Sequence, residues 1–93
     1  MTLAYATALA DARACLAALA GAASDFDESV HFEHLLLDLD ALHPEVPGLS
    51  PISAGKVELL AQLEAAVDQM IGLGGDGLSL ELLLAGALVG DFL

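Results

Sequence analysis

The sequence predicts an all-α fold: a compact antiparallel four-helix bundle that occupies residues 1–93 as a single domain. Apolar side chains recur at helical spacing in four segments, and residues typical of helix starts and ends bound these segments. Valine and isoleucine together number only seven, and no segment alternates apolar and polar residues as a half-buried strand would. Short connections favour neighbouring helices that run in opposite directions.

The first helix is expected over residues 2–22. Alanine fills many of its positions and gives it a high helix propensity. Its apolar side chains follow the i, i+4, i+7 pattern of one helix face. This stripe consists of Tyr5, Leu9, Ala12, Leu16 and Leu19.

The second helix is expected over residues 25–42. Ser24 or Asp25 would cap its start, and Glu28 follows Asp25 at the spacing of a capping box. Acidic residues in the first turn also face the positive end of the helix dipole. The apolar face consists of Phe32, Leu35, Leu36, Leu39 and Leu42. The prolines of residues 43–48 then predict a loop, because each disfavours helix in the residue before it.

The third helix is expected over residues 51–71, with Ser50 as its cap and Pro51 at its first position. Four glycines between residues 72 and 77 predict a flexible connector after it. Its apolar stripe is the clearest in the chain and consists of Ile52, Leu59, Leu60, Leu63, Val67, Met70 and Ile71.

The fourth helix is expected over residues 78–92, with Asp76 or Ser79 as its cap, and it is apolar on two opposite sides. A helix that is apolar all round is normally buried on both sides, yet a small bundle offers only one side of its own core. We therefore expect one side to meet another chain, most simply a second copy. The alternatives are a different protein or a helix central to its own bundle. One side carries Leu78, Leu82, Ala85, Val89 and Phe92, and the opposite side carries Leu80, Leu84, Ala87 and Leu88. Leu80, Leu84 and Leu88 of the second side are the expected interface.

Charge and composition exclude several function classes. The 14 acidic and two basic residues give a formal net charge of −12, and 57% of the residues are hydrophobic. Two cations cannot neutralise a row of phosphates, so nucleic acid and anionic membrane surfaces are not expected partners. The high hydrophobic content argues against a disordered chain. Abundant alanine, leucine and glycine with little lysine and no asparagine are typical of proteins from GC-rich bacteria.

The single cysteine, Cys15, cannot form a disulfide within the chain, which favours a reducing cytoplasm. The apolar start lacks a basic stretch and is interrupted by Asp11 and Arg13, so a signal peptide is not expected. Cys15 lies among alanines and leucines with no expected base nearby, so we interpret it as a small core residue.

The strongest candidate for a metal site is a stripe on the second helix. Asp27, His31, His34 and Asp38 follow one another at spacings of 4, 3 and 4. Two imidazoles one turn apart can share a divalent metal, and nearby carboxylates can ligate the metal or orient the imidazoles. The favoured interpretation is a solvated face with i, i+4 Asp–His pairs, because a single helix with mixed His and Asp residues is not specific for a metal. No metal ligand or cofactor is therefore expected.

The glycine-rich connector matches parts of two binding motifs in sequence, but it lacks other features that these motifs require. Gly72, Gly74 and Gly77 have dinucleotide-motif spacing but follow a helix rather than a strand, and Asp76 would repel a pyrophosphate. The segment 73–78 also resembles the phosphopantetheine-attachment motif of acyl and peptidyl carrier proteins, which are small acidic four-helix proteins. The attachment serine of that family is replaced here by Gly77, so the resemblance does not imply a carrier function.

Two function classes remain after these exclusions. The first is a non-enzymatic protein–protein interaction or regulatory module that acts as a homodimer. Its charge would either steer it to a basic protein or only keep an apolar chain in solution. The second is a bundle that binds a metal or small ligand through the Asp27, His31, His34 and Asp38 stripe. Few polar groups converge anywhere in the sequence, so no catalytic residue is expected.

Overall fold

The computed structural model describes residues 2–43, 45, 46, 48, 52 and 54–89, apart from the side chain of Val89. These residues form four helices and no strand, which confirms the predicted four-helix all-α fold. The radius of gyration of 12.1 Å matches the value of about 12 Å expected for a compact chain of this length. The helices are α1 (Leu3–Gly21), α2 (Phe26–Ala41), α3 (Lys56–Gly72) and α4 (Gly77–Val89).

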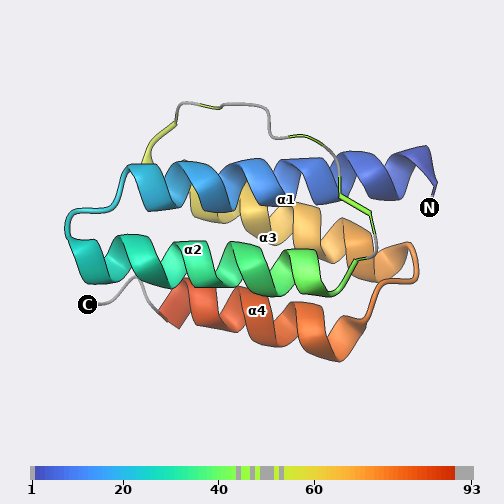
Figure 1. The fold of residues 1–93 in the computed structure, drawn as a ribbon. Coiled ribbons are helices and arrows are strands. Elements are labelled where there is room, and N and C mark those ends of the chain that lie inside the picture. The colour runs from blue at the N-terminus through green and yellow to red at the C-terminus, as the bar shows by residue number, and fades with distance from the viewer. Residues whose placement is uncertain (1, 44, 47, 49–51, 53, 90–93) are drawn as a thin grey trace.

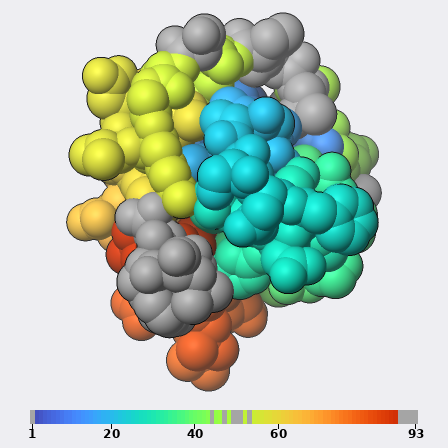
Figure 2. All heavy atoms as spheres, turned by 90° about the vertical axis from the view of Figure 1, so that its left-hand side faces the viewer, coloured from blue at the N-terminus to red at the C-terminus, as the bar shows by residue number. Residues whose placement is uncertain are grey.

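Each helix packs against two others. The helix α1 contacts α2 and α3, and α4 contacts the same two helices from the other side. Figure 1 shows α1 and α2 running in opposite directions, and α3 and α4 doing the same. In the end view of Figure 2, α4 projects at the lower edge of the molecule. This position leaves part of its surface outside the core.

Polar side chains cap three of the four helices at their starts. The hydroxyl of Thr2 accepts the N–H of Tyr5 at 3.1 Å. The carboxylate of Asp25 accepts the N–H of Glu28 at 2.8 Å, as the capping-box spacing predicts. Asp76, rather than Ser79, caps α4, because its Oδ1 accepts the Ser79 N–H at 3.2 Å. Each cap satisfies a backbone donor that has no partner inside its helix.

The predicted start of the third helix is wrong. The described residues Ile52, Ala54 and Gly55 are not helical, and α3 begins at Lys56. Gly55 is its N-cap and offers no side-chain bond. Glycine weakens a helix interior by about 1 kcal/mol relative to alanine, so the helix begins after it. The predicted cap at residues 50–51 lies outside the described residues, as does the predicted end of the fourth helix at residue 92.

The core lies between the four helices and follows most of the predicted stripes. Two predicted members are instead at its edge, since Ile52 is 37% exposed and Leu42 is 38% exposed. Phe32 is the largest of the fully buried side chains. The others in that group are Leu9, Leu16, Leu19, Leu39, Leu59, Leu63, Met70, Leu80, Val67 and Cys15.

Both basic side chains of the chain form ion pairs with α2. Arg13, which is only 8% exposed, donates from Nε to Oδ1 of Asp40 at 2.7 Å and from its terminal nitrogen to Oδ2 at 3.2 Å. Lys56 donates to Glu28 at 2.8 Å. These pairs join α2 to α1 and to the start of α3. Every other described Asp and Glu residue is exposed, so the outer surface is acidic.

The turn between α3 and α4 depends on two glycines. Gly74 has φ = +101°, a conformation that side chains rarely adopt. A Cβ on Gly75 would stand 2.9 Å from the Met70 carbonyl oxygen, the Tyr5 hydroxyl and a methyl group of Leu80. The glycine-rich connector is therefore a tight helix–helix turn at the end of the core.

Among the described residues, α1 alone has the length and apolar composition that would suffice to cross a membrane. A core helix of a globular protein meets the same criteria. In this fold the buried side of α1 includes Leu9, Leu16 and Leu19, which belong to the shared core.

Candidate functional site

The helices α2 and α4 are joined closely at Gly86. Nε2 of His31 lies 2.8 Å from the Gly86 carbonyl oxygen. A Cβ on Gly86 would stand 3.3 Å from a methyl group of Leu35, which is closer than ordinary van der Waals contact. The missing side chain therefore lets the two helices approach at this point.

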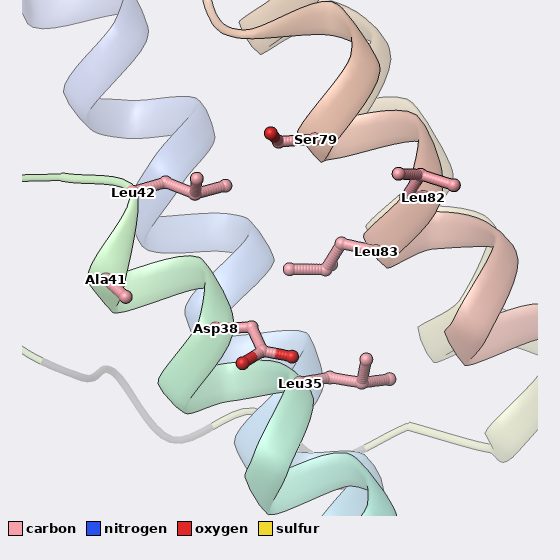
Figure 3. A pocket seen from close by; sticks show the side chains of 7 residues that line it. All are labelled: Leu35, Asp38, Ala41, Leu42, Ser79, Leu82 and Leu83. Carbon is pink, nitrogen blue, oxygen red and sulfur yellow. The ribbon is translucent and has the colours of Figure 1, made fainter.

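A groove of about 390 Å³ separates α2 from α4 beyond this contact. Leu35 and Leu83 are buried and form its floor, with 8% and 6% of their surfaces exposed. Figure 3 shows Leu42 directed from α2 toward α4, and Leu83 directed from α4 toward α2. The complete lining consists of Leu35, Asp38, Ala41, Leu42, Ser79, Leu82 and Leu83. The groove is thus mainly apolar.

Asp38 brings a negative charge to this apolar groove. Figure 3 shows its carboxylate beside Leu35, on the side of α2 that faces α4. Among the described residues no side chain forms a hydrogen bond or ion pair with it. The nearby Ser79 hydroxyl donates instead to Asp76 at 2.9 Å. The Asp38 carboxylate is therefore left to solvent at the groove.

Exposed apolar residues extend the groove along α4. Leu78 and Leu82 are 71% and 65% exposed. They lie one helical turn apart, and the exposed Ala85 follows on the same side. We call Leu78, Leu82 and Ala85 the α4 stripe. Together with the groove it forms an apolar surface that no described part of the chain covers.

The three predicted interface residues differ from one another in burial. Leu80 is 1% exposed and belongs to the core of its own chain, so it has no surface left for a second chain. Leu84 is partly buried against the same core. Leu88 remains 42% exposed. The interface assignment is therefore corrected at Leu80.

The burial pattern of α4 gives the reason for this difference. Its buried side consists of Leu80, Leu83 and Ala87. The side with Leu80 and Ala87 was expected to meet another chain, whereas Leu78 and Leu82 lie on the side expected to face the core and are exposed instead. Leucine occurs on every side of this helix, so sequence periodicity does not identify the side that faces α2 and α3. Contacts with those two helices decide it.

The side chains of the candidate metal stripe on α2 do not converge. Asp27, His34 and Asp38 are exposed, whereas His31 turns toward α4. Because a carbonyl oxygen only accepts, Nε2 of His31 carries the proton in its contact with Gly86. Within the part of the chain that the structure describes, no group of three or more His, Cys, Asp or Glu side chains is placed to hold a metal ion.

A second polar contact ties the opposite end of α2 to α1. The Nδ1 atom of His43 lies 2.8 Å from the Leu39 carbonyl oxygen, and its Nε2 lies 2.7 Å from the Tyr5 hydroxyl. The carbonyl requires a proton on Nδ1, so in the neutral ring Nε2 accepts the hydrogen bond from Tyr5. Burial raises the pKa of Tyr5, which favours this protonated donor. The sequence showed His43 only as a loop residue.

Cys15 is a core residue, as predicted, with 1% of its surface exposed. Burial, followed by the nearby Asp11 charge, raises the pKa of its thiol to about 11. We expect native Cys15 to resist alkylation by iodoacetamide at pH 8, because little of the thiol is ionised at this pH and the reagent cannot reach the buried sulfur. Mass spectrometry should show complete labelling in urea and none in the native state over the same time. Equal labelling in both states would contradict the placement of this thiol.

No protein-family profile, no curated protein and no solved structure matches the chain. The apolar surface between α2 and α4 is therefore the basis for the functional proposal that follows.

Proposed function

We propose that this chain is a non-enzymatic protein–protein interaction module that binds through the α2–α4 groove and the α4 stripe. The observation that carries this proposal is the exposure of Leu78 and Leu82 beside an apolar groove. Complete burial of a leucine side chain contributes about 1.5–3 kcal/mol. A contiguous exposed apolar surface is typical of interaction sites, and a partner that covers these leucines would gain this free energy.

The polar groups of the groove support binding rather than catalysis. Asp38 has neither a described base nor a described nucleophile bonded to it, and the Ser79 hydroxyl donates to Asp76, the residue that caps α4. A nucleophile needs an adjacent base or a lowered pKa. Cys15 has neither, since it is buried and its pKa is raised.

We further propose a cytoplasmic location. A single buried free cysteine suits a reducing compartment. The apolar side of α1 packs against the other helices of a compact chain, which supports a water-soluble protein. The homodimer predicted from the sequence through Leu80, Leu84 and Leu88 stays a prediction. The apolar surface between α2 and α4 is a different surface, which a second copy or a different protein can cover.

Affinity purification of matched variants from cells that produce the protein tests the proposed function. The wild-type protein should retain a stoichiometric partner. Co-production of a second copy with a different tag shows whether that partner is the same chain. Leu82→Gln should lose that partner, because it places a polar amide on the exposed stripe without touching the core. Glu64→Gln, an exposed change on α3, should keep it. The absence of a stoichiometric partner, or its retention by Leu82→Gln, would contradict the proposal.

A further inference from the structure

We propose that the occupant of the α2–α4 groove is a basic amphipathic helix of a different protein, with leucine-like anchors on one side and a lysine or arginine that pairs with Asp38. This inference rests on the proposed function and specifies the chemistry of the partner. Three features of the described residues support it: the acidic surface, the Asp38 carboxylate and the shape of the apolar surface.

The charge distribution favours a basic partner over a second copy. The net charge is −12, and both cations already form ion pairs with α2 inside the fold. The remaining described carboxylates are exposed, including Asp38 in the groove and Glu81 next to Leu82. Two copies meeting through this face would bring like charges together, which opposes association. A positively charged protein would instead be attracted over a distance.

The Asp38 carboxylate determines which charge a partner must bring to the groove. A partner that packs on Leu35 and Leu83 would remove water from the carboxylate between them. Burying an ionised carboxylate is unfavourable unless a cation or hydrogen-bond donors compensate it. No described side chain does so. The partner therefore has to provide the positive charge at this position.

The apolar part of the surface fits a helix. The groove lies between two helices and is joined by the α4 stripe, in which Leu78 and Leu82 are one turn apart. A helix placed in such a groove is anchored by side chains at i, i+3 or i+4, and i+7. Basic residues on its other positions would face the acidic surroundings of the groove.

Fluorescence anisotropy with synthetic peptides tests this inference. The probe is a labelled leucine–lysine peptide of about 18 residues, or five helical turns, with leucines at i, i+3, i+4 and i+7. One control peptide has the same composition with the leucine stripe scrambled, and another has glutamate in place of lysine. The stripe peptide should bind wild-type protein, and added salt should weaken its binding. Neither control should bind comparably.

Protein variants locate the peptide on the surface. Leu82→Gln should raise the dissociation constant about tenfold and Asp38→Asn about fivefold, whereas Glu64→Gln should change it less than about twofold. Circular dichroism checks that each variant is folded. Equal binding of the scrambled peptide, or equal effects of Asp38→Asn and Glu64→Gln, would overturn the inference.

Oligomeric state separates failure of this inference from failure of the proposed function. If wild-type protein sediments as a dimer that Leu82→Gln converts to a monomer, the occupant is a second copy. The basic-helix inference is then wrong, while the interaction module stands. If neither the affinity purification nor the peptide titration finds binding that depends on Leu82, the proposed function itself is wrong.

Discussion

Replacing Phe32 by alanine is expected to lower the free energy of unfolding by about 3–5 kcal/mol. Phe32 is the largest of the fully buried side chains and belongs to the core that all four helices share. Its truncation removes apolar burial and leaves a cavity that neighbouring leucines fill only in part. Domains of this size have total stabilities of about 5–15 kcal/mol. The variant should therefore be marginally folded.

Urea denaturation followed by circular dichroism measures this loss. His34→Ala is a suitable control, because His34 is exposed on the same helix, and it should change stability by less than about 0.5 kcal/mol. If Phe32→Ala cost no more than His34→Ala, the core described above would be wrong.

Replacing Asp40 by alanine is expected to lower the free energy of unfolding by about 2–4 kcal/mol, a little less than the loss on breaking a fully buried ion pair. The change leaves the Arg13 guanidinium, whose side chain is only 10% exposed, without its two contacts to Asp40. Asp40 itself is 28% exposed at its side chain, so water compensates for part of the loss. The same denaturation experiment measures the effect.

A second variant tests whether the cost comes from the buried guanidinium. Arg13→Met combined with Asp40→Leu replaces the ion pair by apolar groups of similar size. It should be clearly more stable than Asp40→Ala, because no buried guanidinium has lost its two contacts with Asp40. Equal instability of the two variants would show that the ion pair is not the reason for the loss.

Local patterns predicted the four helices well because local interactions define them. The stripe through Leu9 and Leu16 identified α1, and the Asp25-to-Glu28 spacing identified the start of α2. The start of α3 was missed because a serine–proline pair is a strong local signal. Gly55, the N-cap of the described helix, forms no side-chain hydrogen bond and therefore provides no comparable signal.

The groove could not be predicted, because it depends on how two helices separate in space. A single glycine, Gly86, allows the close contact with His31 and Leu35. The same contact places Nε2 of His31 against a backbone carbonyl, whereas the sequence pattern grouped this histidine with His34. Which leucines of α4 remain exposed depends equally on the packing of α2 and α3. Helical periodicity alone does not contain that information.

Site-specific photo-cross-linking in living cells tests the central claim, that the α2–α4 surface binds another protein. A benzophenone amino acid would replace Leu82 on the α4 stripe and, as the matched control, Glu64 on the exposed surface of α3. We predict a discrete cross-linked protein from position 82 and none from position 64. We also predict that Leu42→Gln at the groove reduces the yield. No product from position 82, or the same products from both positions, would contradict the claim.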